Sequence, residues 1–596
     1  MAWRIRRLGF IEKRLVLGLL AGIASSIVIV LFYWLVVLVV KINSMIIGGN
    51  GIATSDLSII ALHSTSPLLL LVIVPLGALL SGLIVSRLEP LAKGPGANIT
   101  IKLYHYGLEM RKRTPIVKAI ASAILVGSGG SGGLQGPSLQ IGAGIGSNIS
   151  RLLGLNLIEH RIMIVAGMAG ALSAIFRSPL GAALFAVEVL YRRDLEADAL
   201  VSAFVSSITS YSIAVHVLGY EWLLPPAHIP VPLLFGFTPI LTYILLGVSA
   251  AGFTLIYIHL YHGTVEFFNK LEKKHQKPWL NPVIGAVPVA VLGVIAPYVI
   301  GSGSTTISLI LQEASRGELS LRVLSLGVEL SLVALILFKI IATSLSIGSG
   351  GSGGLFAPSI FIGGLFGLLY GILIGTPLSS LPPHIYAYIG MASLFGAATN
   401  TPLATAFMVA EMGDNYTLII PAIISALIAN ELIRYDTLYP AQILRRTHPL
   451  IASLRTILET IRSHPRLRKL RVRDFENPEY QAVTIDHSLR DAVRVMREYR
   501  QRFIPVIDNN DRIIGVVDSE TIRYAYRRKL YDRRLGEIPL KKDYVSLEPL
   551  RELEKALEEM IHYGKDYAII VDGEKRYRGV LLVEDLSIII SQYLVP

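Results

Sequence analysis

The 596-residue sequence contains no cysteine. This absence excludes disulfide frameworks, thiol nucleophiles, iron–sulfur clusters and thiolate zinc sites. Charge is scarce too: only 16% of the residues are Asp, Glu, Lys or Arg, whereas 52% are hydrophobic. This composition is too apolar for one large soluble protein and also excludes disordered and collagen-like chains. Most of the chain is therefore expected to lie in a membrane.

The few charges are distributed unevenly. They make up roughly a tenth of residues 1–445 but about a third of residues 446–596. The sequence therefore predicts a membrane domain followed by a soluble tail. The net charge of +12 does not form a stripe, because basic and acidic residues alternate in the tail, so no nucleic-acid partner is expected.

Catalytic signatures are missing as well. Paired-histidine, nucleophile-elbow and phosphate-loop patterns are not found, so the protein is not expected to be an enzyme, to hold a metal or to require a cofactor.

Long apolar runs recur along the first 445 residues. Several are long enough, or nearly so, to cross a hydrocarbon core of about 30 Å; they cover 15–40, 67–86, 199–218, 238–260, 282–300, 328–347 and 416–433. Others are shorter and interrupted by Gly or Pro, at 118–126, 162–175, 179–190, 359–376 and 402–412. The interrupted runs predict half-helices that meet inside the membrane, where irregular backbone survives only if it is buried or lines a polar path.

Basic residues precede the first apolar run and follow the last. Because basic residues favour the cytoplasmic side, they predict a multi-pass protein of the cell membrane with both chain ends in the cytoplasm. The run at 15–40 lacks a cleavage site and is too long for a signal peptide, so it is expected to be a retained helix.

An internal repeat relates two halves of the membrane part. Gly127–Gly142 and Gly348–Gly363 agree at 12 of 16 positions with an offset of 221, which Lys118 and Lys339 share. Gly167–Glu188 aligns with Gly390–Glu411 at an offset of 223. Repeated halves with broken segments at matching places are typical of transporters and channels. Close helix packing through glycine is the alternative explanation for a single such run.

The glycine-rich segments favour anions. A helix that starts inside the protein directs unpaired N–H groups and the positive end of its dipole into the gap, and such ends bind anions. Lys118 and Lys339 are the main lysine candidates for buried charge, and acids within the spans are rare. A cation path would need rings of carboxylates or ordered carbonyls. The residues therefore indicate an anion pathway.

Four motifs resemble, in order and spacing, the signature regions of the CLC chloride channels and chloride/proton antiporters. They are the Gly94–Gly96 segment, GLQGP at Gly133–Pro137, GLFAP at Gly354–Pro358 and LYPAQIL around Tyr439. The resemblance implies a polytopic all-α membrane protein with an inverted repeat of tilted, broken helices. It also implies a homodimer in membrane lipid with one anion path per subunit. The positions that it assigns to anion binding are Pro95, Gly96, Leu355, Phe356, Ala357 and Tyr439.

Three departures from the family pattern bear on mechanism. Pro95 takes the place of the coordinating serine and brings neither hydroxyl nor N–H, and Ala97 and Asn98 are also off-pattern. Some family members that favour nitrate carry proline there, so chloride selectivity is open. The retained Tyr439 argues against the fluoride-exporting branch.

The second departure is Gln135, before Gly136, where the family has a gating glutamate. Glutamine is nearly the size of a protonated glutamate but cannot ionise, so it cannot carry a proton. The third is Val189, at the family's inner proton-relay position. Glu188 is a candidate substitute acid, because acids in membranes are functional by default. However, Glu411 matches it in the other half, which favours a structural role.

The tail resembles a tandem pair of CBS domains with α/β structure. Strands are expected at 482–485, 503–507, 513–517, 545–547, 568–571 and 577–582, and helices at 490–499, 519–527, 550–562 and 584–593. In the family such a pair regulates the pore and often binds an adenine nucleotide. Of the usual nucleotide-binding pattern only Asp585 is retained, so a structural module without ligand is the alternative.

These observations predict four regions. Residues 1–445 form the transmembrane domain, with halves at roughly 15–218 and 238–445, and 471–530 and 531–596 form the CBS domains. Residues 446–470 form a basic linker, interpreted as a solvated or membrane-flanking stretch, with a regulatory surface or a lipid-facing anchor as the alternative. The predicted function is a chloride or nitrate channel, or uncoupled uniporter, regulated by the tail. An anion/proton antiporter that uses Glu188, and a non-conducting membrane sensor, are the alternatives.

Overall fold

A computed structural model describes most of the chain. The described residues are 9–48, 56–106, 110–220, 223–227, 229–321, 323, 325–433, 436–445, 454, 457–458, 460–462, 467–477, 479–499, 501–528, 530–583 and 585–586. The chain divides into two compact units. The membrane unit comprises Met1–Tyr104 and Glu109–Arg446, and the tail unit His105–Leu108 and Thr447–Pro596.

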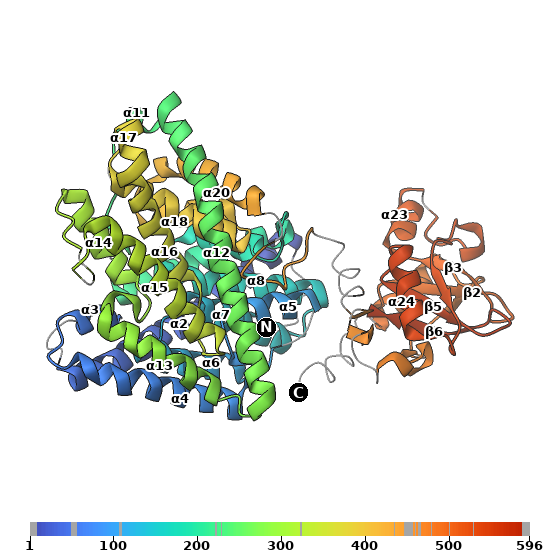
Figure 1. Ribbon diagram of the computed structural model, residues 1–596. Coiled ribbons are helices and arrows are strands. Elements are labelled where there is room, and N and C mark those ends of the chain that lie inside the picture. Colours follow the sequence, from blue (N-terminus) through green and yellow to red (C-terminus); the bar gives the residue numbers. More distant parts are fainter. Residues whose placement is uncertain are drawn as a thin grey trace. The chain divides into compact units, whose positions relative to one another are not determined.

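The membrane unit is helical (Figure 1). Its helices in the first half are α2 (Phe10–Ile47), α3 (Leu57–Leu62), α4 (Leu70–Leu88), α5 (Ala97–Tyr106), α6 (Thr114–Gly127), α7 (Gln135–Leu153), α8 (Leu157–Phe176), α9 (Pro179–Glu188) and α10 (Leu200–Leu218). Those that follow are α11 (Val231–Leu234), α12 (Phe237–His275), α13 (Leu280–Ile295), α14 (Ser304–Arg316), α15 (Val328–Gly348), α16 (Phe356–Tyr370), α17 (Thr376–Ser379), α18 (Pro383–Thr399), α19 (Pro402–Met412) and α20 (Ile419–Ile433). Short 3₁₀ turns lie at Pro67–Leu69, Pro90–Ala92, Ala197–Ala199, Pro297–Val299 and Tyr416–Leu418, and a π turn at Gly371–Gly375.

In the described residues, eight helices are long and apolar enough to cross a membrane. The predicted multi-pass helical membrane protein is thus confirmed. Two helices are longer than predicted, since α2 has 38 residues and α12 has 39, whereas about 20 suffice to span a bilayer. The last turns of α12 are polar, and a Glu266–Lys270 ion pair one turn apart supports the helix there.

The sequence did not predict α5, α7, α14 and α18 as separate helices. In α5, α7 and α14 the apolar residues are interrupted by glycine, serine or polar residues, so no long apolar run marks them. The small residues have a packing role. A Cβ atom on Gly142 of α7 would lie 2.2 Å from the carbonyl oxygen of Gly167 on α8, and one on Gly363 of α16 would lie 2.7 Å from that of Gly390 on α18. Glycine therefore lets these buried helices approach closely in both halves.

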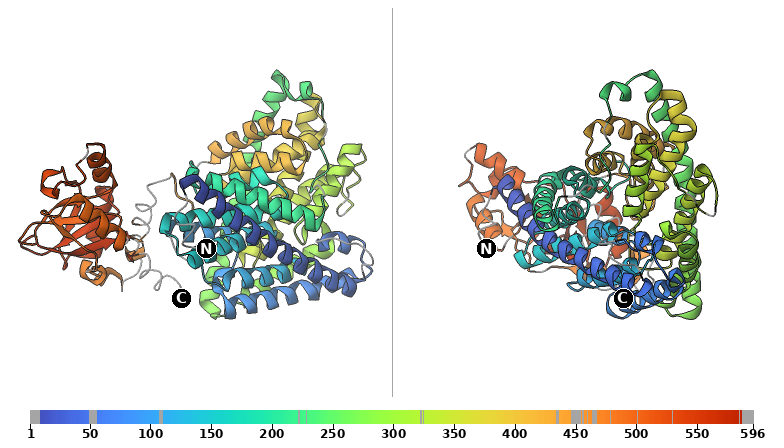
Figure 2. Two further views of the ribbon diagram at one scale, coloured as in Figure 1. Left: turned by 180° about the vertical axis from the view of Figure 1, so that it is seen from behind. Right: turned by 90° about the vertical axis from the view of Figure 1, so that its left-hand side faces the viewer.

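Equivalent helices of the two halves run in opposite directions. α9 packs against α19, and the last-turn glutamate of each accepts N–H groups from the first turn of the other. α4 and α13 also lie side by side (Figure 1). The right-hand view of Figure 2 shows the blue-to-teal first half next to the green-to-orange second half. The predicted inverted repeat is confirmed.

The tail unit contains two three-stranded sheets with the same topology. The strands are β1 (Val483–Thr484), β2 (Ile504–Ile507), β3 (Ile513–Val517), β4 (Val545–Leu547), β5 (Tyr567–Val571) and β6 (Tyr577–Leu582). The orders are β1-β2-β3 and β4-β5-β6, each with a parallel pair first and an antiparallel pair second. The predicted α/β tail is confirmed.

The tail helices are α22 (Leu489–Glu498), α23 (Ser519–Arg527) and α24 (Leu553–His562), with 3₁₀ turns at Leu467–Lys469, Val472–Phe475 and Leu535–Glu537. Ser488 begins α22 with a capping box to Asp491. Phe503 and Val516 of the first module share a core with Ile569 and Val580 of the second. The helix predicted at 584–593 lies largely outside the described residues.

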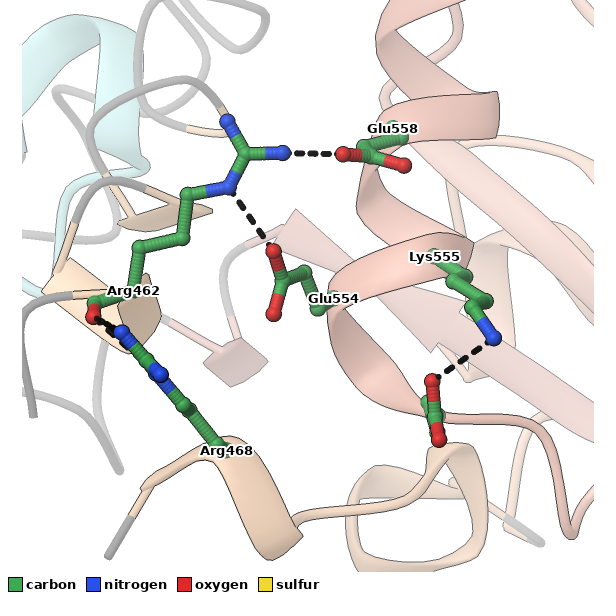
Figure 3. Close-up of polar contacts among 6 residues, drawn as sticks. Arg462, Arg468, Glu554, Lys555 and Glu558 are labelled. Carbon is green, nitrogen blue, oxygen red and sulfur yellow. Dashed lines mark hydrogen bonds and ion pairs between the residues drawn. The ribbon is translucent and has the colours of Figure 1, made fainter. Parts of the chain in front are cut away.

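The segment predicted as a basic linker, 446–470, contacts the tail unit in its described part. Leu454, Ile457 and Ile461 are buried. Figure 3 shows the Arg462 guanidinium between the carboxylates of Glu554 and Glu558 on α24, at 2.8 Å from Glu554. This ion pairing connects the described part of the segment to α24 of the tail unit.

Candidate functional site

Three glycine-rich loops meet inside the membrane unit. Gly133 and Gly354, equivalent at the offset of 221, exchange two backbone hydrogen bonds of 2.7 Å. A Cβ atom on Gly136 would lie 2.4 Å from the carbonyl oxygen of Pro95. The loops that precede α5, α7 and α16 are therefore in contact, and the positive ends of three helix dipoles gather at this junction.

The loop at Gly94–Gly96, here called the first loop, has a counterpart in the second half of the membrane unit. This second loop, Gly301–Gly303, binds a carboxylate. Gly301–Gly303 precedes α14 as Gly94–Gly96 precedes α5, and the four glycines have φ between 63° and 81°, a left-handed region that favours glycine. Buried Asp56 accepts hydrogen bonds of 2.8 Å from the Ser302 hydroxyl and from the N–H of Gly303. This loop geometry therefore binds a negatively charged oxygen at a helix start.

A fully buried lysine holds each loop in place. Two carbonyls accept from each ammonium group: Ala92 (3.0 Å) and Gly94 (2.6 Å) for Lys118, and Val299 (2.9 Å) and Gly301 (3.1 Å) for Lys339. The lysines thus bind loop carbonyls and fix the backbone of both loops.

Pro95 occupies the position that Ser302 has in the second loop. Proline brings neither a hydroxyl nor an N–H, so the first loop lacks the side-chain donor that contacts Asp56 in the second. At the first loop the nearest backbone donors are those of Gly96 and of the first turn of α5.

Gln135 is the first residue of α7 and lies at the junction, where a Cβ atom on Gly133 would be 2.4 Å from its Oε1. Among the described residues this buried oxygen has no hydrogen-bond partner. Gln135 lines a narrow pocket with Phe356 and Ala357; of the other described residues in the lining only Ser304 is polar. The pocket thus contains no ionisable group from the described part of the chain.

Leu355, Phe356 and Ala357 form the start of α16 and are buried. The Phe356 ring packs in an aromatic cluster, with centroid distances of 4.1 Å to Phe176 and Phe395. This packing fixes the first turn of α16 and the direction of its N–H groups.

Tyr439 is 2% exposed, and its hydroxyl has no hydrogen-bond partner among the described residues. Its loop is connected to the first motif, because the Ala441 N–H donates to the side-chain oxygen of Asn98 at 2.8 Å. The structure therefore brings the fourth motif to the start of α5.

Gln442 fixes the other side of the Tyr439 loop. Its amide nitrogen donates to the carbonyls of Val189 (2.9 Å), Tyr191 (3.4 Å) and Thr399 (2.7 Å), and its oxygen accepts from Asn400 (3.0 Å) and Thr437 (2.9 Å). Val189 contributes only its backbone carbonyl to this network.

Glu188 and Glu411 cap each other's helices. Glu188 accepts from the N–H groups of Ala404 (2.7 Å) and Leu403 (3.3 Å), and Glu411 accepts from those of Gly181 (2.9 Å) and Leu180 (3.0 Å). Both carboxylates thus serve as N-terminal caps at positions related by the repeat.

In the tail, Asp585 is half-buried and accepts a 3.4 Å hydrogen bond from the side chain of Asn477. In the other module Asp518 accepts from Lys541 at 2.8 Å and from the Thr521 N–H at 2.9 Å. Burial alone would raise the pKa of Asp518, but these hydrogen bonds outweigh it and lower the pKa below its ordinary value. Asp518 is thus already paired with a lysine.

Sequence reasoning missed Asp56, Ser302 and the contact of Asn98. The Gly-Ser-Gly motif at 301–303 can be read in the sequence, but it does not align with Gly94–Gly96. Gly301 lies 38 positions before Lys339, whereas Gly94 lies 24 positions before Lys118. The repeat therefore does not continue to this loop at an offset of 221.

Comparison with known proteins agrees with this geometry. A family model described as "Voltage gated chloride channel" matches residues 77–434, more than half of the chain. This chain belongs to the CLC family. A CBS domain model matches residues 472–528. The CLC resemblance and the predicted CBS tail are thus confirmed, and anion transport is the activity that this family membership carries.

Two similar proteins each match more than 60% of this chain. The H(+)/Cl(-) exchange transporter ClcA of Vibrio campbellii is 30% identical over 396 residues, which cover 64% of this chain and 81% of that protein. An uncharacterized protein of Methanocaldococcus jannaschii is 28% identical over 368 residues, 62% of this chain and 86% of its own.

A solved structure of a eukaryotic CLC transporter has the same fold over nearly the whole chain. The TM-score is 0.59 at 19% sequence identity, and the match covers 97% of this chain and 98% of that one. At this identity the likeness establishes the CLC fold alone.

Proposed function

We propose that this CLC protein lets chloride or nitrate pass down its gradient, as a channel or uncoupled uniporter, without moving protons. The observation that carries the proposal is Gln135, a side chain that cannot ionise, at the junction of the three loops. The protein would act as a homodimer in the cell membrane, with both termini in the cytoplasm.

The proposed anion site uses backbone donors. Gly96, Leu355, Phe356 and Ala357 lie at helix starts beside the junction, and Tyr439 would add a phenol hydroxyl. The Asp56 carboxylate in the second loop supports this proposal, because it is an anion bound by an equivalent loop.

The proposed lack of coupling has a second support. Val189 offers no ionisable group, and both Glu188 oxygens already accept N–H groups of α19. A proton on Glu188 would compete with these helix caps. We therefore propose a structural role for Glu188.

The experiment is anion efflux from liposomes that contain the purified protein, with external pH recorded at the same time. Efflux of chloride or nitrate without proton movement supports the uncoupled pathway. Proton movement against its gradient, driven by chloride, would refute it, and no efflux of either anion from folded protein would refute conduction altogether.

Antiport is the second candidate, because the Vibrio campbellii relative is named an H(+)/Cl(-) exchange transporter. It requires an acid, and Glu188 is the candidate nearest to Val189 in the sequence. The pH record of the same efflux experiment separates the two proposals.

Selectivity is expected to depend on Pro95. In Pro95→Ser the new hydroxyl would donate to the anion as Ser302 does to Asp56. A hydrogen bond to a charged group contributes about 1.5–3 kcal/mol, and chloride, with its charge on one atom, should gain more from a single donor than nitrate, so we expect the chloride-over-nitrate ratio to rise about threefold. Efflux under equal gradients of the two anions measures this ratio, and an unchanged ratio would contradict the assignment.

We also propose that the tail binds an adenine nucleotide beside Asp585. Asp518 of the other module is not the proposed site, because Lys541 already pairs with its carboxylate. Asp585→Ala is expected to weaken nucleotide binding to the full-length protein about tenfold. Calorimetric titration with ATP, ADP and AMP measures it. The exposed Asp532→Ala should bind as the unmodified protein does. If the unmodified protein binds none of the three nucleotides, the tail is a structural module.

A further inference from the structure

Asn98 connects the start of α5 to the loop that carries Tyr439. It lies in the first turn of α5, two residues after Gly96, and its Oδ1 accepts the Ala441 N–H at 2.8 Å. The side chain is half-buried. Asn98 therefore lies where the first and fourth motifs meet.

The hydrogen bond to Ala441 decides which way the Asn98 amide is turned. A backbone N–H can only donate, so the amide oxygen faces Ala441 and the NH₂ group faces away from it. Among the described residues this NH₂ group has no hydrogen-bond partner. Two N–H donors are therefore free beside the N-terminus of a helix.

The second loop shows that a side-chain donor and a backbone N–H together bind a carboxylate at a helix start. There the Ser302 hydroxyl and the Gly303 N–H together hold the Asp56 carboxylate. The first loop has Pro95 in place of Ser302 and thus lacks the side-chain donor. The Asn98 amide is an uncharged side-chain donor in the first turn of α5, the helix that follows the first loop.

We propose that the Asn98 NH₂ group contacts the permeating anion and supplies the side-chain donor that Pro95 lacks. This inference rests on the proposed anion pathway and names a further residue of it. Two N–H donors on one planar group suit the oxygens of nitrate as well as a chloride ion.

The test compares chloride and nitrate efflux from liposomes for two variants. Asn98→Ala removes the donors and the tether to Ala441, whereas Asn98→Asp keeps an acceptor for Ala441 but replaces the donors with a negative charge. We expect efflux to fall about tenfold in Asn98→Ala and further in Asn98→Asp. Asn269→Asp places the same charge at an exposed position of α12 and should leave efflux unchanged.

A purely structural role predicts the opposite order. Asn98→Asp would then conduct as the unmodified protein does, while Asn98→Ala would be impaired, and this outcome would overturn the proposal. Full efflux in Asn98→Ala would overturn it as well. If the unmodified protein shows no efflux, the proposed function itself fails, which is distinct from either result. Size-exclusion chromatography confirms that each variant remains folded.

Discussion

Replacing Gln135 with glutamate is expected to reduce chloride efflux at pH 7.5 by about tenfold or more, and to make efflux rise as the pH falls. An ordinary carboxyl group is ionised at pH 7.5 and largely protonated near pH 4. The ionised form would place a negative charge at the loop junction, where it competes with the anion for the N–H groups. The protonated form resembles the native glutamine in size and charge, so acid should restore efflux.

The comparison requires efflux at several pH values with the same chloride gradient. The unmodified protein should show a much flatter profile, because the described lining of the pocket at Gln135 has no ionisable side chain. Gln276→Glu introduces the same change at an exposed position and controls for surface charge. A Gln135→Glu variant whose efflux equals that of the unmodified protein at pH 7.5 would place Gln135 outside the anion path.

The Gln135→Glu variant also bears on coupling. If the new acid exchanges protons with the outside, chloride efflux should be accompanied by a small proton flux, which we do not expect of the unmodified protein. Full antiport is not expected, because Val189 still provides no inner proton acceptor.

Local patterns predicted much of the fold. Apolar runs located the long spans, and β-branched runs located β3 (Ile513–Val517), β4 (Val545–Leu547) and β6 (Tyr577–Leu582) with the bounds that the structure has. These elements can be recognised in the amino-acid sequence because one face of the element, or the whole element, is apolar. The helices α5 and α14 are short and rich in polar residues, so no long apolar run marks them.

The site was predicted only in part for a related reason. Glycine spacing identified the loops of Gly133 and Gly354, whose contact follows from the repeat. The occupied loop at Ser302 and the Asn98–Ala441 contact depend on residues 246 and 343 positions apart, respectively. Pairings at such separations are set by the tertiary fold and leave no local pattern in one sequence.

The reciprocal caps give the largest expected effect on stability. Each carboxylate binds one buried and one partly buried N–H group of the other half, for example Glu188 with Ala404 and Leu403. An unsatisfied buried donor costs about 1–3 kcal/mol and a partly buried one costs less, so Glu188→Ala should destabilise the membrane unit by roughly 1–4 kcal/mol. Glu411→Ala should have a similar effect, because its carboxylate makes the equivalent contacts with Leu180 and Gly181.

Thermal unfolding in detergent, followed by near-UV circular dichroism, measures the loss. Glu188→Gln is the matched control, because its amide oxygen still accepts an N–H group while the ionisable proton site is gone. A structural role therefore predicts that Glu188→Ala melts at a much lower temperature, and that Glu188→Gln melts closer to the unmodified protein and conducts chloride without change. If instead Glu188→Gln retained chloride efflux but abolished a proton flux seen in the unmodified protein, Glu188 would be a proton relay and the protein an antiporter.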